Sequence, residues 1–274
     1  MRDLIASSSP SDAFAAFNVI TLEHAEAIVW AAEDCGLPVI VQLSENSIRY
    51  HHRGETIVAA LVALADSSPA DIVLHLDHIT DEGLAKKTAE WGFSSLMWDA
   101  STRPYDDNVI STKGMAQWGA SVGVWVESEL GEVGGKDGAH APGVKTQPHE
   151  AQAFVEQTGV DALAVAVGSS HAMQEKTATL DIDLIRNIAS QVDVPLVLHG
   201  SSGVPDDVLV SAIDAGMRKI NIGTALNLAM TSAIRTVLIE NPSVSDPRKY
   251  LEPARSATRE TVSHLLRTVS GQTI

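Results

Sequence analysis

Residues 71–102 read DIVLHLDHITDEGLAKKTAEWGFSSLMWDAST, and this stretch holds one full unit of the pattern that decides the fold. Two short apolar runs, 72–76 and 95–99, are typical of strands that are buried on both faces. Residues 81–91 between them have helical periodicity, with Thr80 as the expected cap and two acidic residues in the first turn. A strand, a helix and a second strand in this order predict that the two strands pair in parallel.

The same alternation runs along the whole chain. Strand-like runs occupy residues 16–20, 39–43, 72–76, 95–99, 121–126, 162–167, 196–199 and 219–222. Helix-like segments follow them at residues 22–34, 54–66, 81–91, 107–118, 149–158, 181–191, 206–215 and 225–238. One uninterrupted series of strand–helix units predicts a closed (β/α)₈ TIM barrel rather than an open sheet. We expect a single domain over residues 1–274, with an additional C-terminal amphipathic helix near 248–268.

Composition limits the classes of function. The chain has 274 residues, 45% of them hydrophobic, and a net charge of -16. The basic residues do not cluster, which argues against a nucleic-acid partner, and a phosphate site would have to be built locally from backbone amides. Cys35 is the single cysteine, so an internal disulfide is excluded. Because we find neither a signal peptide nor a membrane-spanning run, we expect a cytoplasmic protein without a membrane partner.

Reactive side chains gather where the predicted strands end. In a barrel of this kind the carboxyl ends of the strands form the active-site face. The residues expected there are His75, Asp77, His78, Asp99, Glu127, Glu129, His171, His199, Asn221 and Thr224. Three of the ten histidines, His78, His171 and His199, follow different strands, and three imidazoles on one rim favour a catalytic zinc ion. We interpret His75, deeper in its strand, as structural.

A phosphate site is predicted separately. Residues 200–203 read GSSG after the seventh strand, and residues 221–224 read NIGT after the eighth, directly before a helix. Loops after these two strands form the recurrent phosphate site of TIM barrels. Residues 131–145, GEVGGKDGAHAPGVK, form an unusually long glycine-rich connection, for which we favour a functional lid over a tolerated surface insertion.

Several motifs, in order along the chain, resemble the class II fructose- and tagatose-bisphosphate aldolases. They are AFNV at 16–19, HLDH at 75–78, ESELG at 127–131, GSSH at 168–171, LHGSSG at 198–203, KINIGT at 219–224 and DPRKYLEPAR at 246–255. The resemblance covers nearly the whole chain. It implies a lyase that cleaves a phosphorylated ketose into dihydroxyacetone phosphate and an aldehyde, by a zinc-dependent route that needs no lysine Schiff base.

The resemblance also implies roles for individual residues. His78, His171 and His199 would bind zinc, and Asp99 and Glu129 would lie beside the metal, where such acids can hold a second divalent or monovalent cation. Asp77 would be the acid/base at the hydroxyl whose deprotonation starts the cleavage. Substrate would contact residues at the first two strand ends and in the two phosphate loops: Asn18, Ser44, Gly200, Ser201, Ser202, Asn221, Ile222, Gly223 and Thr224.

The chain departs from the family pattern at three places. The loop reads GGKDG at 134–138, so Asp137 would replace a glutamate as the second catalytic acid/base. Thr102 stands where a histidine is usual. Gly223 stands where fructose-type members carry an aspartate, which makes a tagatose-type or other ketose phosphate as probable a substrate as the fructose compound. The distal phosphate has three candidate cations on the last helix, namely Arg248, Arg255 and Arg259.

Three other functions remain open at this point. The same barrel and metal site could serve a metal-dependent sugar-phosphate isomerase or epimerase, or an aldolase for another ketose phosphate such as a deoxy-keto-gluconate phosphate. The altered loop at Asp137 is compatible with a non-catalytic sugar-phosphate binder. In each case the partner is a small phosphorylated sugar, and the terminal amphipathic helix predicts a homo-oligomer, a dimer or tetramer.

Overall fold

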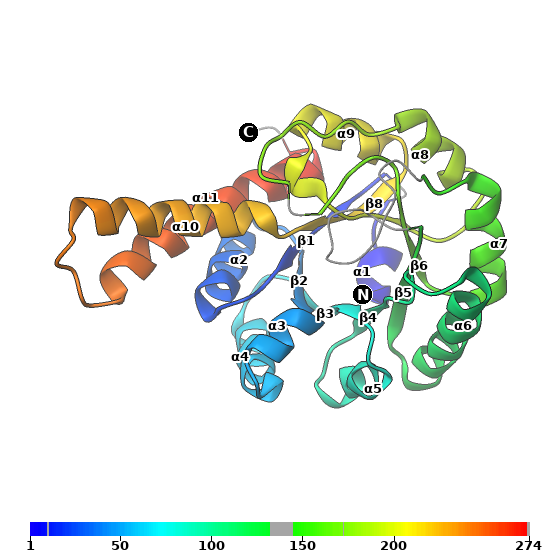
Figure 1. Cartoon of the computed structure of the whole chain (residues 1–274), viewed down its shortest axis with the longest axis horizontal. Helices are drawn as coiled ribbons and strands as arrows, with labels where there is room; N and C mark the ends of the chain where they lie inside the picture. The colour runs from blue at the N-terminus through cyan, green and yellow to red at the C-terminus, as the bar shows by residue number, and fades with distance from the viewer. Residues whose placement is uncertain (10, 132–144, 172, 273–274) are drawn as a thin grey trace.

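The computed structural model describes residues 1–9, 11–131, 145–171 and 173–272. Within them, eight parallel strands hydrogen-bond in sequence order, and the last pairs with the first to close a barrel (Figure 1). The predicted TIM barrel is confirmed. The strands are β1 (Phe14–Asn18), β2 (Val39–Ser44), β3 (Ile72–Ile79), β4 (Ser95–Trp98), β5 (Trp125–Leu130), β6 (Ala162–Val165), β7 (Leu196–Leu198) and β8 (Met217–Ile222).

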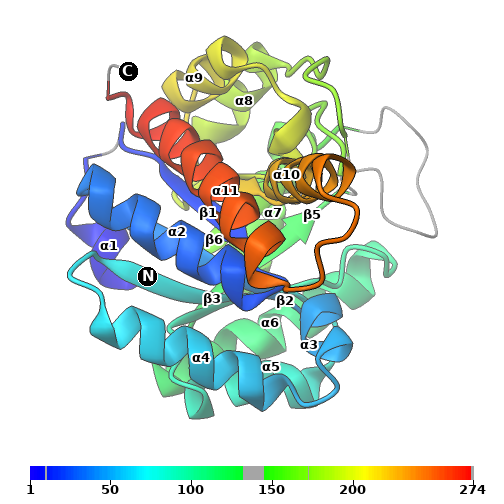
Figure 2. The same cartoon turned by 90° about the vertical axis from the view of Figure 1, so that its left-hand side faces the viewer.

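Helices surround the barrel on the outside. They are α2 (Leu22–Cys35), α3 (Glu45–Tyr50), α4 (Gly54–Ser67), α5 (Glu82–Glu90), α6 (Tyr105–Val122), α7 (Pro148–Thr158), α8 (Ile182–Ala189), α9 (Asp206–Asp214), α10 (Thr224–Glu240) and α11 (Arg248–Ser270). The predicted C-terminal helix is α11, which lies along α2 (Figure 2). With α10 it forms a hairpin that projects beyond the ring of strands (Figure 1).

Four elements differ from the sequence prediction. The strand predicted at 121–126 is wrong, because α6 continues to Val122 and β5 begins only at Trp125. Gly123, with φ 76°, ends that helix in the left-handed conformation, so the break falls two residues before the strand. Two short helices, α1 (Arg2–Ala6) and α3, were not predicted. The cap of α5 is Asp81 rather than Thr80, since its carboxylate accepts from the Leu84 N–H at 2.8 Å.

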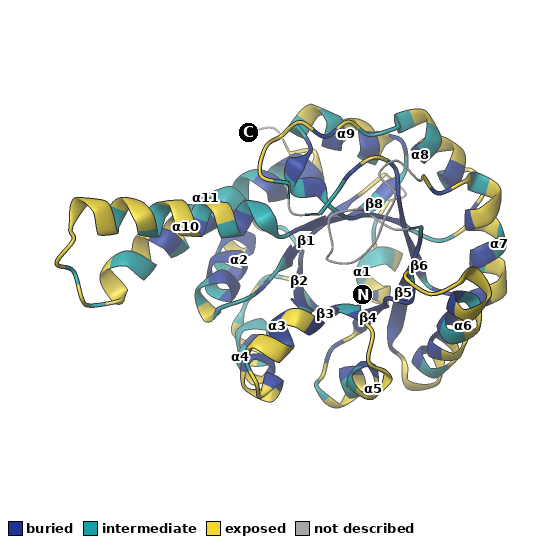
Figure 3. Cartoon of the chain, viewed as in Figure 1, coloured by how far each residue is buried: buried dark blue, intermediate teal, exposed yellow. Residues whose placement is uncertain are grey.

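Two apolar cores lie on opposite sides of the strands. The larger one fills the space between the barrel and its helices, where the buried residues concentrate (Figure 3). The smaller one lies inside the barrel and consists of Met1, Phe14, Ala16, Ile40, Trp125, Ala162, Ala164 and Val197, with Leu4 and Ile5 of α1 packed against it. Helix α1 therefore closes the amino-terminal end of the barrel, and the remaining interior towards the carboxyl ends is polar.

None of the helices in the described part of the chain is long and apolar enough to cross a membrane.

Candidate active site and metal centre

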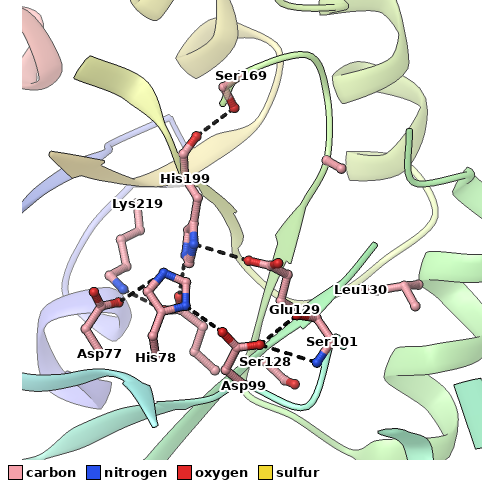
Figure 4. A network of polar contacts seen from close by, with 12 residues as sticks. Asp77, His78, Asp99, Ser101, Ser128, Glu129, Leu130, Ser169, His199 and Lys219 are labelled. Atoms are coloured by element: carbon pink, nitrogen blue, oxygen red, sulfur yellow. Dashed lines mark hydrogen bonds and ion pairs between the residues drawn. The ribbon is translucent and has the colours of Figure 1, made fainter. Parts of the chain in front are cut away.

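A bulge in β3 turns two adjacent side chains to the same side. Neighbouring residues of a regular strand point to opposite faces. Here the pairing with β4 goes from Leu76 opposite Leu96 to Ile79 opposite Trp98, so β3 has one extra residue in between. His78 lies in this bulge. Its φ of 51° is a left-handed conformation that residues with a side chain seldom adopt. Asp77 and His78 consequently both face the polar interior (Figure 4).

Three imidazoles meet at this end of the barrel. His78 comes from the bulge in β3, His171 from the loop after β6, and His199 from the residue after β7. One nitrogen of each ring lies within 4.8 Å of the others, and the rings meet edge to face at 72–85°. The structure thus brings together the three predicted zinc ligands, in an arrangement suited to a metal with nitrogen ligands and an open position.

Asp99 orients His78. Its Oδ2 lies 2.8 Å from His78 Nδ1, and its Oδ1 accepts from the hydroxyl of Ser101 at 2.7 Å. A carboxylate only accepts, so Nδ1 of His78 carries a proton and Nε2 is the nitrogen that would face a metal. Asp99 was predicted beside the metal, and it contacts His78, one of the predicted ligands.

Two glutamates flank His199. Glu127 Oε1 lies 3.3 Å from Nε2, and Glu129 Oε2 lies 3.2 Å from Nδ1 without hydrogen-bond geometry. Burial opposes charge on this ring, but the contacts with Glu127 and Glu129 raise the pKa of His199 to about 9. Glu129 was among the predicted metal residues. Glu127 was not assigned a role, although its position two residues before Glu129 in one strand puts both on one face.

A second polar layer lies beneath the histidines. Lys219 of β8 is buried and places its Nζ 2.7 Å from Glu127 Oε2 and 3.3 Å from His75 Nε2. His75 in turn contacts Ser95 Oγ through Nδ1 at 2.8 Å. Burial, and then the charge of Lys219, lower the pKa of His75 to about 3, so this ring is neutral. Lys219 was not predicted as a site residue.

Asp77 is a buried carboxylate whose two oxygens have different surroundings. Asn18 Nδ2 donates to its Oδ2 at 2.7 Å, and Gln42 Nε2 donates to Asn18 Oδ1 at 3.2 Å. Its Oδ1 has no hydrogen-bond partner within the described residues. Burial would raise the pKa of Asp77, but the neighbouring His78 and His199 and the ammonium of Lys219 lower it, so the group is ionised at neutral pH.

The two glycine-containing loops form the adjoining wall. Gly200 has φ 67°, and a Cβ there would lie 2.6 Å from the backbone of Ser170, so the loops after β6 and β7 pack closely through this glycine. Ser202 Oγ accepts from the Ala225 N–H at 3.2 Å, in the first turn of α10. The amino-terminal end of α10 thus lies beside the seventh-strand loop, as a phosphate site requires.

Most predicted substrate residues line one cavity of about 370 Å³. It is bounded by Asn18, Ser44, Asp77, His78, Asp99, His171, Gly200, Ser202, Asn221, Gly223 and Thr224, together with the unpredicted Glu45, Asn46, Thr80 and Asn227. Two predicted contacts, Ser201 and Ile222, are not on its wall. Ile222 packs in the outer core, and Ser201 donates its hydroxyl to the Asn221 carbonyl.

The three arginines considered for the distal phosphate lie elsewhere. Arg255 pairs with Glu26 and stacks on Trp30 with 4.7 Å to the ring centroid. Arg259 pairs with Asp34, and Arg248 with Asp246. Among the described residues, no lysine or arginine lines the cavity. Asp137 and the loop that contains it lie outside the described residues.

The charges around the histidines fit a dication. Four carboxylates, of Asp77, Asp99, Glu127 and Glu129, surround the cluster, and within the described residues their cationic partners are Lys219 and the protonated ring of His199, so negative charge is in excess. His199 Nδ1 and Asp77 Oδ1 are buried without a hydrogen-bond partner. Orphaned polar atoms and excess negative charge are costly in a protein interior unless a ligand compensates them.

Comparisons with known proteins find relatives that match nearly the whole chain. The family model described as "Fructose-bisphosphate aldolase class-II" matches residues 6–273. A fructose-bisphosphate aldolase of Staphylococcus aureus (strain Mu50) is 39% identical over 250 residues, 90% of this chain and 87% of that protein. A 6-phospho-5-dehydro-2-deoxy-D-gluconate aldolase of Bacillus licheniformis is 38% identical over 254 residues, 92% and 87% respectively. The crystal structure of the YdjI aldolase from Escherichia coli K12 superimposes with a TM-score of 0.80 at 29% identity, covering 96% of this chain and 92% of that one.

Proposed function

Because the chain belongs to the class II fructose-bisphosphate aldolase family and is therefore a lyase, we propose that it is a zinc-dependent aldolase of a phosphorylated ketose. The products would be dihydroxyacetone phosphate and an aldehyde. We propose one aldolase domain over residues 1–274, working in the cytoplasm. The observation that carries the proposal is the bulge in β3, which sets a buried, ionised Asp77 beside three converging histidines.

His78, His171 and His199 would hold the metal, His78 through Nε2 and His199 through Nδ1, the nitrogens that Asp99 and Glu127 leave available. When bound, zinc supplies a Lewis acid that polarises the ketone and stabilises the negative charge of the enediolate. A second cation, divalent or monovalent, would lie at Asp99 and Glu129.

Dihydroxyacetone phosphate would bind with its phosphate at the two loops. Support comes from Gly200, Ser202, Gly223 and Thr224 on the cavity wall and from the start of the 17-residue helix α10. Backbone N–H groups and the positive end of a helix dipole favour a dianion there without a lysine or arginine. Asn18 and Ser44 would contact the sugar hydroxyls.

Asp77 would perform the first proton transfer. Its free Oδ1 takes the proton from the hydroxyl on the carbon that becomes the aldehyde, the C–C bond breaks, and the electron pair of that bond passes into the enediolate. Asn18 keeps the carboxylate in place throughout. Asp137 is proposed to return a proton to the enediolate carbon, which completes the balance.

The substrate is proposed as a tagatose- or fructose-1,6-bisphosphate-like ketose. A deoxy-keto-gluconate phosphate is a second candidate, favoured by the B. licheniformis relative and by Gly223, which leaves the wall without a carboxylate at this position. Retro-aldol assays on the three compounds side by side, with a coupled enzyme that traps the released triose, decide between them.

Chelation tests the function as a whole. We expect dialysis against a chelator to abolish triose release, and Zn²⁺ to restore it. Full activity after complete metal removal would contradict the zinc-dependent mechanism. Turnover of a ketose phosphate without any released triose would instead identify an isomerase or epimerase on the same barrel.

The proposal includes a homo-oligomer, a dimer or tetramer. Support comes from the hairpin of α10 and α11, which projects from the barrel and exposes Ile239 at 77% and Leu238 at 40% near its tip. Apolar side chains on a projecting element are typical of a subunit contact.

A further inference from the structure

Lys219 takes no part in the proposed reaction, yet it is buried inside the barrel, beside the three-histidine cluster (Figure 4). An ammonium group removed from water is costly unless its partners are well placed. Its two partners are Glu127 Oε2 at 2.7 Å and His75 Nε2 at 3.3 Å. What these partners contact in turn indicates what the lysine does.

Glu127 joins Lys219 to a proposed metal ligand. One carboxylate oxygen contacts the ammonium, and the other, Oε1, lies 3.3 Å from His199 Nε2. A carboxylate can only accept, so the proton of His199 must be on Nε2. Nδ1 lies 3.2 Å from Glu129 Oε2 without hydrogen-bond geometry, so it is the nitrogen of His199 that a metal would take.

The other partner fixes the direction of the ammonium. His75 is neutral, and Lys219 can only donate, so His75 Nε2 accepts and its Nδ1 donates to Ser95 Oγ at 2.8 Å. Ser95 and His75 face each other across β3 and β4. Lys219 therefore donates in two directions, to His75, whose ring is held by Ser95, and to Glu127.

We propose that Lys219 is a positioning residue that orients the carboxylate of Glu127 so that His199 presents Nδ1 to the metal. This inference rests on the proposed three-histidine site. His199 would then bind the metal through Nδ1, whereas His78, whose Nδ1 contacts Asp99, would bind it through Nε2. Carboxylates that hold ligating histidines affect metal affinity strongly, and here the carboxylate itself has a fixed partner.

Replacing Glu127 by glutamine distinguishes a positioning role of Lys219 from a purely structural one. In Glu127→Gln, Lys219 forces the amide oxygen towards itself, because an ammonium cannot accept. The amide NH₂ group then faces His199 Nε2, which must accept, and the proton moves to Nδ1, where it blocks metal binding. In Lys219→Met/Glu127→Gln the amide is free to turn its oxygen to His199. The double variant should therefore bind zinc more tightly than Glu127→Gln alone.

The experiment measures zinc dissociation constants by competition with a chelating dye, and thermal unfolding of each metal-free protein. We expect Lys219→Met to weaken binding by about 10–100-fold, Glu127→Gln to weaken it further, and the double variant to regain about tenfold over Glu127→Gln. Lys87→Met, which removes an exposed lysine paired with Glu55, is the matched control and should bind as the unmodified protein does.

Two results would overturn the inference: a Lys219→Met protein that binds zinc as tightly as the unmodified chain, or a double variant that binds no more tightly than Glu127→Gln. If Lys219→Met does not fold, the comparison of the double variant with Glu127→Gln still decides, because the double variant leaves no unpaired buried charge. An unmodified protein that binds no zinc would refute the proposed metal site instead.

Discussion

Asp77 combines a fixed oxygen with a free one. Asn18 holds Oδ2, whereas Oδ1 has no hydrogen-bond partner within the described residues, and Asp77 lines the cavity. We expect Asp77→Asn to fold and to bind zinc normally, because the shape is unchanged, while kcat falls by about 10²–10⁴, the usual contribution of a general base. The measurement is triose release together with the metal content. Asp107→Asn, at an exposed position in α6, is the control, and an Asp77→Asn enzyme with unchanged kcat would contradict the assigned role.

Gly200 is required by both its conformation and its neighbours. Its φ is 67°, and a Cβ would lie 2.6 Å from backbone atoms of Ser170. Gly200→Ala should lower the free energy of unfolding by more than the ~1 kcal/mol that left-handed strain alone costs, and should raise KM for the ketose phosphate. Gly36→Ala isolates the strain, since Gly36 has φ 61° and open space around it. Chemical denaturation and steady-state kinetics compare the two, and equal losses would show that the Ser170 contact is unimportant.

At the scale of single residues, the sequence located reactive groups at the carboxyl ends of strands but missed groups deeper inside them. His78 lies at the end of β3, and His171 and His199 follow β6 and β7. TIM barrels place reactive residues at these ends, and the structure brings the three together. Lys219 and Glu127 are inside strands. An isolated charge in a strand does not reveal its partner, because the pair is 92 residues apart and meets only when the barrel closes.

Glu45 links helix α3 to the connection between β3 and α5. It begins α3, and its Oε2 accepts from the Thr80 N–H at 2.7 Å, the Asp81 N–H at 3.2 Å and the Thr80 hydroxyl at 3.1 Å. These bonds hold the chain directly after the bulge in β3.

We expect Glu45→Ala to destabilise the protein by about 2 kcal/mol, since a buried carboxylate with several donors is lost, and to lower zinc affinity by loosening His78. Denaturant titration and dye competition measure the two effects. Glu55→Ala, which removes an exposed partner of Lys87, is the control and should change neither. Unchanged stability in Glu45→Ala would show that the bonds to Thr80 and Asp81 contribute little.

At the scale of elements, the hydrophobic periodicity located most strands and helices, but not the boundary between α6 and β5. Residues 121–126 read SVGVWV, in which apolar residues alternate as in a strand, although Val122 still belongs to the helix. The decisive signal was Gly123, a helix-ending glycine within the apparent strand. Helix α3 was missed because six residues are too few to show a helical period.

The projecting hairpin gives a prediction about the whole molecule. If α10 and α11 contact another subunit, Ile239→Asp should shift the sedimentation coefficient to that of a smaller species, because a charge would be buried in the contact. The thermal stability of the subunit should be little affected, since Ile239 is 77% exposed within one chain. Ile110→Asp on α6, at an equally exposed site of 71%, is the control. An Ile239→Asp protein that sediments like the unmodified one would place the contact elsewhere.

The architecture of the whole molecule was predictable because each strand–helix unit repeats one simple pattern and parallel strands in series close into a barrel. The direction of the terminal hairpin was not. Helical periodicity identified both helices, but where they point depends on the packing of α11 against α2, through Arg255 and Arg259 beside Trp30. Such contacts join residues more than 200 positions apart, so no local sequence pattern predicts them.

The extra residue in β3 has a consequence for protein engineering. The dipeptide Asp77-His78, grafted onto a regular strand of another barrel, would send its carboxylate and its imidazole to opposite faces. The transplantable unit is therefore larger than its reactive groups: it includes the left-handed turn at His78 and the partner strand that tolerates it. A designer who copies this centre must copy an irregular backbone first, and only then the side chains.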